Sequence, residues 1–313
     1  MKSFCFFFLF SIFIDGTAQL SNPVLKKDFP DPTVIKSGTK YYAYATNSGS
    51  NIQVAVSADL QNWQLLPDAM PVKPIWADKD FWAPHVLYDA GLKKYVLFYS
   101  GESLDDKTGK CLGVAFSEKP EGPFKDVGRP LLCGEGFINI DPMAFVDPKD
   151  GKRWLFWGSG FKPIKIQEMN KDWTGFKEGT SAKDLIPVAR ETYDRLVEGA
   201  WVDYENGKYY MYYSGDNCCG DKAHYAVMVA KANTVTGPYE SLGQANGTGS
   251  SVILEQDSNW LAPGHNSIIT DSKGKKFIAF HAIPKSQDGR VRGSGRVFCI
   301  RPISYKNGWP VLE

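Results

Sequence analysis

Three carboxylic acids occupy matching places in a pattern that the sequence repeats. Asp31, Asp141 and Glu198 each stand directly before a short apolar stretch with the composition of a β-strand. If these strands are equivalent in the fold, the acids converge on one pocket, where their mutual repulsion raises the pKa of at least one of them. A protonated carboxyl facing an ionised one is the minimal machinery for hydrolysing a glycosidic bond.

A structural turn is the alternative explanation for each acid. Asp31 and Asp141 both precede a proline, as aspartates in turns often do. Glu198 fits that explanation poorly, because glutamate is not a turn former and the residue lies in the apolar stretch Leu196-Val-Glu-Gly-Ala-Trp. The set of three is therefore better explained by chemistry than by turns.

The pattern behind the acids occurs five times along the chain. Each copy joins an apolar strand, a polar turn with glycine and an aromatic-rich strand, at residues 32–45, 84–99, 142–157, 199–213 and 265–280. The aromatic strands recur at intervals of 54, 59, 55 and 68 residues, which leaves room for four strands in each unit. The sequence therefore predicts an all-β, five-bladed β-propeller. A β-sandwich is the alternative, but it does not explain a repeat of this length.

The repeat also predicts where the acids lie. The first strand of each blade lines the central channel, so the residues before these strands crowd one mouth of it. They are Asp31, Ala83, Asp141, Glu198 and Gly264, with His265 adjacent. Residues 24–27 are expected to add an outer strand to the last blade and close the ring.

The totals limit the classes of function. The 313 residues carry 36 basic and 35 acidic side chains, a net charge of +1, which argues against a nucleic acid as partner. Aromatic residues make up 14%; most suit strands and core packing, although their faces also stack on sugar rings. Residues 1–18 resemble a signal peptide, with Lys2 before an apolar run, although a buried strand is an alternative. We expect a catalytic propeller over 19–313, secreted or periplasmic, with no membrane span.

Five cysteines follow the predicted signal peptide, and two of them are adjacent. Their spacing matches neither a zinc knuckle nor a CxxC redox pair. Cys218 and Cys219 are either a disulfide between neighbours or two buried thiols, and the sequence leaves both open.

Six segments in order resemble the successive blade motifs of glycoside hydrolase family 43. They are Asp28-Phe-Pro-Asp-Pro-Thr-Val-Ile, Phe81-Trp-Ala-Pro-His-Val, Ile140-Asp-Pro-Met-Ala-Phe, Val197-Glu-Gly-Ala-Trp, Pro263-Gly-His-Asn-Ser-Ile and Gly295-Arg-Val-Phe-Cys-Ile-Arg-Pro-Ile. The resemblance implies a five-bladed propeller that hydrolyses pentosides with inversion. It implies Asp31 as the general base, Glu198 as the general acid and Asp141 as the residue that orients Glu198 and raises its pKa.

The resemblance also suggests supporting residues. Phe81 and Trp82 are expected to form a stacking wall for the sugar, or else to fill the channel, and Trp201 is expected to face the channel or a neighbouring blade. Arg296 matches an arginine that the family points at its substrate, with a buried ion pair as the alternative. His265 matches a histidine that lies beside an axial calcium ion in arabinan-cleaving relatives, or is a hydrogen-bonded channel residue. No cofactor is expected to be required.

The expected substrate is an oligo- or polysaccharide containing α-L-arabinofuranosides. The segment from Tyr213 to Ala230, with its paired cysteines, resembles arabinan-active members of the family more than its xylosidases. A β-xylosidase is the alternative enzyme. A catalytically inactive glycan-binding propeller is the alternative class, although a binding module has no need of three channel acids.

Overall fold

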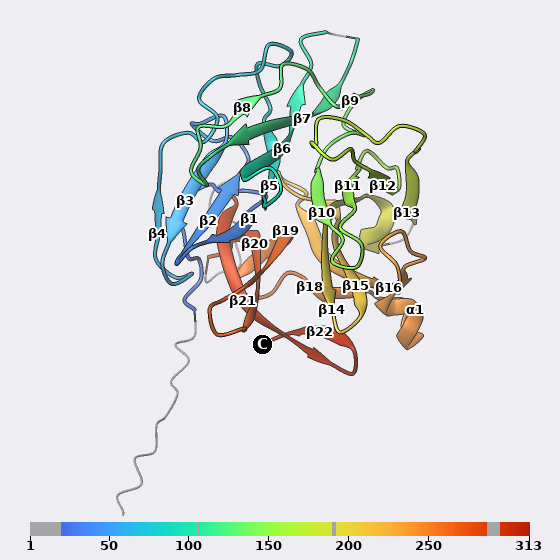
Figure 1. Ribbon diagram of the computed structural model, residues 1–313. Helices are drawn as coiled ribbons and strands as arrows, with labels where there is room; N and C mark the ends of the chain where they lie inside the picture. Colours follow the sequence, from blue (N-terminus) through green and yellow to red (C-terminus); the bar gives the residue numbers. More distant parts are fainter. Residues whose placement is uncertain (1–19, 106, 190–191, 287–294) are drawn as a thin grey trace, which may run out of the picture.

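The computed structural model describes residues 20–105, 107–189, 192–286 and 295–313. The predicted signal peptide, residues 1–18, lies outside them. The described chain forms five antiparallel sheets arranged around one axis, each with four or five strands in chain order from the inside outward (Figure 1). This arrangement confirms the predicted five-bladed propeller.

The first blade contains β1 (Thr33–Ser37), β2 (Lys40–Ala45), β3 (Gln53–Ser57) and β4 (Trp63–Leu65). The second contains β5 (Trp82–Asp89), β6 (Lys94–Glu102), β7 (Lys110–Ser117), β8 (Lys125–Asp126) and β9 (Leu132–Cys133). The third contains β10 (Met143–Val146), β11 (Arg153–Trp157), β12 (Ile164–Glu168) and β13 (Lys183–Ile186). The fourth contains β14 (Val197–Glu205), β15 (Lys208–Asn217), β16 (His224–Ala232), β17 (Glu240–Ser241) and β18 (Val252–Leu254). The fifth contains β19 (Trp260–Thr270), β20 (Lys276–Pro284), β21 (Val297–Lys306) and β22 (Trp309–Leu312).

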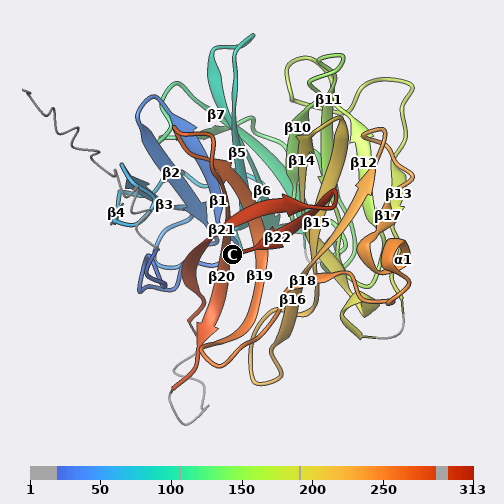
Figure 2. The same ribbon diagram turned by 90° about the horizontal axis from the view of Figure 1, so that it is seen from below.

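Helix is confined to two short pieces of the described chain, the 3₁₀ turn η1 (Thr192–Arg195) and α1 (Leu242–Asn246). None of the described helices is long and apolar enough to cross a membrane. The inner strands contact one another in a closed cycle, β1 to β5, β10, β14, β19 and back to β1. The last blade, drawn in red, accordingly stands beside the first, drawn in blue (Figure 2).

The aromatic second strands are buried on both faces, because each blade packs against two neighbours. In β15, Tyr209, Met211 and Tyr213 pack into the core shared with the third blade. Tyr210 and Tyr212 of the same strand pack into the core shared with the fifth blade. A strand covered on both faces needs an almost continuous apolar run rather than an alternating one, which explains the repeated aromatic clusters.

The N-terminal segment closes the ring in a way that the sequence predicted in part. Leu25 forms a β-bridge with Phe298 on the outer edge of β21. Further along that edge β21 already pairs with β22, so the fifth blade is not short of an outer strand. The segment instead continues an interrupted outer strand, as β9 does beside β8 and β18 beside β17.

Candidate active site

One residue at the start of each inner strand adopts a left-handed backbone conformation. These residues are Asp31 (φ 57°), Ala83 (φ 46°), Asp141 (φ 60°), Gly199 (φ 58°) and His265 (φ 47°). Four of their backbone N–H groups are bonded by a side chain at the end of the preceding blade's second strand. The bonds run from Asp31 to His281 Nδ1 (3.1 Å), from Ala83 to Thr46 Oγ1 (2.8 Å), from Asp141 to Ser100 Oγ (3.1 Å) and from His265 to Ser214 Oγ (2.8 Å).

This five-fold geometry corrects the predicted alignment of the channel mouth. The equivalent positions in the fourth and fifth blades are Gly199 and His265, not Glu198 and Gly264. Glu198 stands one residue earlier, at a register shift in the pairing of β14 with β15. Two of the five equivalent residues are therefore acids rather than three, and Glu198 reaches the mouth from a different backbone position.

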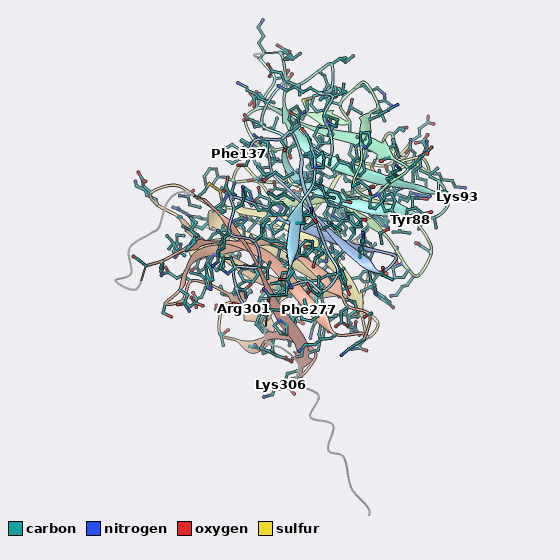
Figure 3. All side chains as sticks on the ribbon, turned by 90° about the vertical axis from the view of Figure 1, so that its left-hand side faces the viewer. Tyr88, Lys93, Phe137, Phe277, Arg301 and Lys306 are labelled. Carbon is teal, nitrogen blue, oxygen red and sulfur yellow. A yellow bond between two sulfur atoms is a disulfide. The ribbon has the colours of Figure 1, made fainter. Side chains whose placement is uncertain are left out.

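A cavity of about 570 Å³ opens at this mouth and collects the predicted acids. Its lining includes Asp31, Asp141, Glu198, Trp82, His265, Arg296, Ile140, Leu196, Phe137, Phe161, Cys218 and Cys219. Loops that join second to third strands form much of the rim, with Phe161 in the third blade and the paired cysteines in the fourth. Phe137, 40% exposed, packs edge-on against Phe161 at the rim. Figure 3 places Phe137 on the opposite side of the molecule from Lys93, which lies in the turn between β5 and β6.

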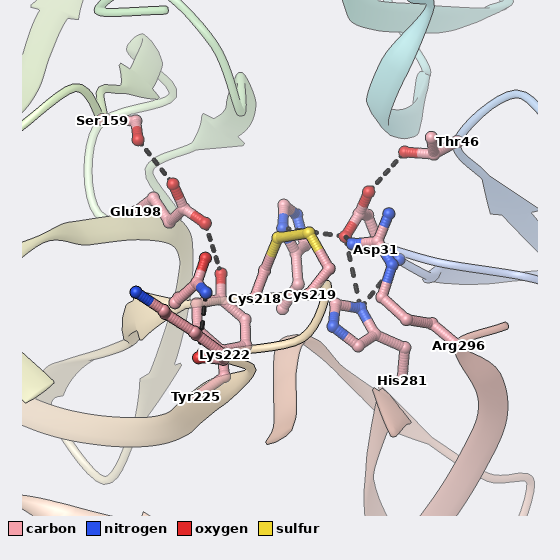
Figure 4. The surroundings of a disulfide bond; sticks show 12 residues. Asp31, Thr46, Ser159, Glu198, Cys218, Cys219, Lys222, Tyr225, His281 and Arg296 are labelled. Atoms are coloured by element: carbon pink, nitrogen blue, oxygen red, sulfur yellow. Dashed lines mark hydrogen bonds and ion pairs between the residues drawn. A yellow bond between two sulfur atoms is a disulfide. The ribbon is translucent and has the colours of Figure 1, made fainter. Parts of the chain in front are cut away.

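Asp31 is buried among cationic and hydrogen-bonding groups. Its carboxylate accepts a hydrogen bond from Arg296 Nη1 at 3.0 Å and another from the Thr46 hydroxyl, and it lies 3.2 Å from His281 Nδ1 (Figure 4). Burial alone would raise the pKa of Asp31, but the charges of Arg296 and His265 and the contact with His281 hold it well below its ordinary value. Asp31 is therefore ionised, as a base must be.

His281 supports Asp31 as a neutral ring. The side chain is fully buried, and burial lowers its pKa to about 4. Its Nδ1 lies 3.1 Å from the backbone nitrogen of Asp31 and 3.2 Å from the carboxylate of the same residue. His281 therefore fixes both the backbone and the side chain of the base.

Glu198 lies in a contrasting environment. One carboxyl oxygen is 2.5 Å from the Ser159 hydroxyl and the other is 2.8 Å from the Tyr225 hydroxyl (Figure 4). Burial raises the pKa of Glu198, and the negative charge of Asp31 raises it further, although the two hydroxyl donors lower it in part. Glu198 therefore retains a proton more readily than an ordinary glutamate.

Asp141 is close enough to both other acids to feel their charges. Its Oδ2 accepts the Gly199 N–H at 3.1 Å and lies 3.7 Å from His265 Nδ1. Burial, followed by the charges of Glu198 and Asp31, raises the pKa of Asp141 well above its ordinary value. A proton can therefore reside on either Asp141 or Glu198, while Asp31 stays ionised.

Sequence reasoning missed the polar side chains that hold the residues of the channel mouth. Thr46, Ser100, Ser159 and Ser214 follow the aromatic strand at matching places in four blades, and His281 does so in the fifth. The repetition of a polar residue after each aromatic strand could have predicted these contacts from the sequence. Tyr225 had no such signal, because it comes from the third strand of its blade. Its ring needs Gly264, where an added Cβ would lie 2.0 Å from a ring carbon of Tyr225.

The predicted sugar-binding aromatics do not all reach the cavity. Trp82 and Arg296 line it. Phe81 does not: its ring is 1% exposed and packs edge-on against Tyr99, so the prediction that it forms a sugar-stacking wall is wrong. Trp201 packs between the cores on both sides of the fourth blade and lies 5.3 Å from the His85 ring, away from the cavity lining.

His265 lies between two of the acids, with Nδ1 3.5 Å from Asp31 and 3.7 Å from Asp141. Calcium prefers six to eight oxygen ligands. Within the described ranges, no group of three or more His, Cys, Asp or Glu is arranged to hold a metal ion. These donors do not form a protein-supplied calcium shell, and we derive no chemical step through a metal.

The structure decides between a disulfide and two free thiols at the adjacent cysteines, which the sequence left open. Cys218 and Cys219 form a disulfide, and Cys111 and Cys133 form a second one, between β7 and β9. Cys299 is buried and free. The adjacent pair lines the cavity, whereas Cys111 and Cys133 do not.

Comparison with known proteins identifies the class of enzyme that uses this arrangement. The family model "Glycosyl hydrolases family 43" matches residues 20–310, almost the whole described chain. The chain belongs to glycoside hydrolase family 43. It is therefore an enzyme that hydrolyses glycosidic bonds, and its fold is the five-bladed propeller that the sequence predicted.

Similar proteins include one named for arabinan and one named for a galactofuranoside. The chain is 28% identical to "Extracellular endo-alpha-(1->5)-L-arabinanase 1" of Bacillus subtilis, over 90% of this chain and 86% of that protein. It is also 28% identical to "Beta-D-galactofuranosidase xynD" of Aspergillus niger, over 95% of this chain and 85% of that one. The crystal structure of a thermostable family-43 glycoside hydrolase superposes with a TM-score of 0.79 at 28% identity, covering 94% and 96% of the two chains.

Proposed function

We propose that this family 43 enzyme is a secreted, inverting hydrolase of α-L-arabinofuranosidic bonds in arabinan or its oligosaccharides. The observation that carries the proposal is that Asp31 and Glu198 line one cavity in opposite settings, Asp31 bonded to the Arg296 guanidinium and Glu198 bonded to the hydroxyls of Ser159 and Tyr225. These neighbours favour a low pKa at Asp31, whereas burial raises the pKa of Glu198. The name of the Bacillus relative supports both the substrate and the extracellular location.

The roles of the acids follow from those shifts. Glu198 donates its proton to the glycosidic oxygen as the bond to the anomeric carbon breaks. Asp31 accepts a proton from a water molecule whose oxygen attacks that carbon from the opposite face. The cycle leaves Asp31 protonated and Glu198 ionised, and exchange with solvent restores both. Inversion requires the two carboxyls to be roughly 6.5–9.5 Å apart, so that the water fits between them.

Asp141 and Arg296 support this cycle. The charge of an ionised Asp141 would favour the protonated form of Glu198, and the bond to the Gly199 N–H fixes Asp141 next to that acid. Arg296 keeps Asp31 ionised, and its guanidinium lines the cavity where a substrate hydroxyl can accept a hydrogen bond. Trp82 also lines the cavity, with the Lys110 ammonium 3.9 Å from the centre of its ring.

Two substrates and two variants test the proposal. We expect the purified chain to release arabinose or arabino-oligosaccharides from linear arabinan and 4-nitrophenyl α-L-arabinofuranoside. Asp31→Asn and Glu198→Gln should each reduce kcat on arabinan by a factor of about 10²–10⁴, since each removes one proton transfer. Glu118→Gln, an exposed residue outside the cavity, is the matched control. NMR of the first product should show the inverted anomer; a retained anomer would refute the role of Asp31 as base.

A β-D-galactofuranosidase is the second candidate, because the Aspergillus relative is as similar as the arabinanase. Release of galactose from 4-nitrophenyl β-D-galactofuranoside, without release of arabinose, would keep the mechanism and replace the substrate. Release of xylose alone from a β-D-xyloside would instead support the xylosidase alternative. A folded chain that is inactive on all of them would support the glycan-binding alternative.

A further inference from the structure

The Cys218–Cys219 disulfide occupies an unusual place for a covalent crosslink. It lies in the loop between β15 and β16, at the same mouth as the acids, and both cysteines line the cavity with Asp31 and Glu198. Figure 4 shows the two sulfur atoms between Glu198 on one side and Asp31 on the other. No step of the proposed mechanism uses it.

Stabilisation of the fold does not explain this crosslink. A disulfide stabilises mainly by restricting the unfolded chain, and the effect grows with the length of the closed loop. Cys111 and Cys133 are 22 residues apart, so their bond closes a loop long enough to restrict the unfolded chain. Cys218 and Cys219 are adjacent, so their bond restricts almost none of the unfolded chain. Its consequence is local, in the shape and chemistry of the loop.

The loop is held firmly against the blade. Cys218 packs on a small apolar cluster that contains Ala223, Tyr225, Ala262 and Ile283. The Asn217 side-chain amide donates to the Lys222 carbonyl at 2.9 Å, and the Ala223 N–H donates to Gly220 at 3.1 Å.

The residue before the loop is fixed as well. Asp216 is 7% exposed, and its carboxylate pairs with Arg195 at 2.5 Å and with His224 at 2.7 Å. One side of the cysteine pair is therefore backed by protein, and the partly exposed side borders the cavity.

The chemistry of the two sulfur atoms complements that of the acids. A disulfide has no N–H or O–H donor and is polarisable, so it makes favourable contacts with C–H groups rather than with hydroxyls. Sugar-sized ligands bind best where apolar walls complement a few fixed polar groups. The acids and Arg296 are among the polar groups that line this cavity, and the two sulfur atoms add a part of the wall without donors, which suits the C–H face of a furanose ring.

We propose that the Cys218–Cys219 disulfide is a specificity-determining wall of the sugar subsite, contacting the C–H face of the furanose held between Asp31 and Glu198. This inference rests on the proposed function, because it requires a furanoside in the cavity. The intact disulfide holds this wall in one conformation, whereas two thiols rotate separately. The disulfide is thus a binding device, and its loss weakens substrate binding more than it slows the chemical step.

Two paired-cysteine variants separate this disulfide from the other. Cys111→Ala/Cys133→Ala keeps only the adjacent pair, and Cys218→Ala/Cys219→Ala keeps only the distant pair. Each is assayed on 4-nitrophenyl α-L-arabinofuranoside and linear arabinan, with and without tris(2-carboxyethyl)phosphine. The phosphine reduces a disulfide to two thiols and is itself oxidised to the phosphine oxide. The wild-type chain under the same two conditions serves if the first variant fails to fold.

Reduction of Cys111→Ala/Cys133→Ala should raise KM about tenfold, the effect of losing one apolar contact in a specificity pocket. Its kcat should stay within about threefold, as expected when the lost contact binds ground state and transition state alike. Cys218→Ala/Cys219→Ala should show the raised KM in both conditions, with an unchanged melting temperature.

An unchanged KM in both proteins would overturn the inference. A loss confined to kcat would also overturn it, because it would indicate displacement of Tyr225 and Glu198. Failure of the untreated wild type to cleave any furanoside would instead refute the proposed function.

Discussion

Asp31 and Glu198 are both buried carboxyls, yet their neighbours shift their pKa values in opposite directions. Asp31 faces a guanidinium and two imidazoles, and these lower its pKa despite burial. Glu198 is bonded to two neutral hydroxyl donors, and these, together with the charge of Arg296, do not offset burial and the charge of Asp31. The division of roles between base and acid therefore depends on the groups that surround each carboxyl rather than on the carboxyls themselves.

Removing a hydroxyl donor should move the alkaline limb of the pH profile. Ser159 stabilises the ionised form of Glu198, so Ser159→Ala should raise the pKa of that acid further. Activity that requires protonated Glu198 then persists to higher pH. The measurement is kcat/KM against pH. Ser214→Ala is the matched control, because that serine bonds only the His265 backbone in the next blade, and an equal shift in both variants would contradict the assignment.

Removing the guanidinium should move the acid limb. Arg296 lowers the pKa of Asp31, so Arg296→Gln should raise it. Activity that requires ionised Asp31 is then lost at a higher pH as the solution is acidified. Arg301→Gln on the same strand, which loses a pair with Asp257 away from the cavity, should leave the limb in place. An acid limb that does not move in Arg296→Gln would exclude Asp31 as the group that titrates there.

At this scale the sequence predicted the acids but not their surroundings. Asp31, Asp141 and Glu198 could be found because each precedes a repeated strand. Phe81 was misplaced, since adjacent residues of a strand point to opposite faces and the choice between Phe81 and Trp82 depends on the bulge that follows. Tyr225 could not be predicted, because only the packing of the fourth blade on the fifth brings it to Glu198.

At the scale of elements, a left-handed residue at or near the start of each inner strand aims the functional side chains. The left-handed residue breaks the regular alternation, so that two successive residues, Ile140 and Asp141, both line the cavity. The sequence predicted the strands and their order from the repeat. It did not predict these left-handed residues, since Asp, Ala, Gly and His share that conformation although alanine does not favour it intrinsically.

A substitution at Gly264 tests how closely the inner strand of the fifth blade approaches Tyr225 of the fourth blade. Its backbone is not left-handed, so Gly264→Ala is allowed by conformation but places Cβ 2.0 Å from the Tyr225 ring. The clash should lower the free energy of unfolding by about 1–3 kcal/mol and displace Tyr225 from Glu198, lowering kcat. Gly175→Ala, where the nearest atom would be 3.6 Å away, is the control. Urea unfolding and kcat on arabinan measure the two effects, and wild-type values for Gly264→Ala would contradict the contact.

At the scale of the molecule, the acids belong to different blades, so the site exists only while the ring is closed. Asp31 comes from the first blade, Asp141 from the turn before the third, and Glu198 from the fourth. The first and fifth blades meet where the N-terminal segment lies on the fifth blade. Phe29 and Trp63 pack against Phe298 there. The repeat predicted that the N-terminal segment joins the last blade. It did not predict that the segment forms only a bridge, from Leu25 to Phe298, because this depends on where β22 stops along β21.

Asn22 tests the closure directly. Its side-chain amide donates to the Ile300 carbonyl at 2.8 Å and accepts the Ile300 N–H at 2.8 Å, in a partly buried setting. Asn22→Ala leaves both backbone groups without partners and should lower the free energy of unfolding by about 1–3 kcal/mol.

Gln61 makes the same two-bond pattern with Ser21, but on the exposed surface. Water replaces those bonds, so Gln61→Ala should cost no more than about 0.5 kcal/mol. Denaturant unfolding should be followed by tryptophan fluorescence and by activity together. Since the cavity needs all the blades, the two signals should disappear at one denaturant concentration in Asn22→Ala. Activity lost well before fluorescence would mean that the ring opens without unfolding, and equal destabilisation by the two variants would show that burial at Asn22 contributes nothing to the closure.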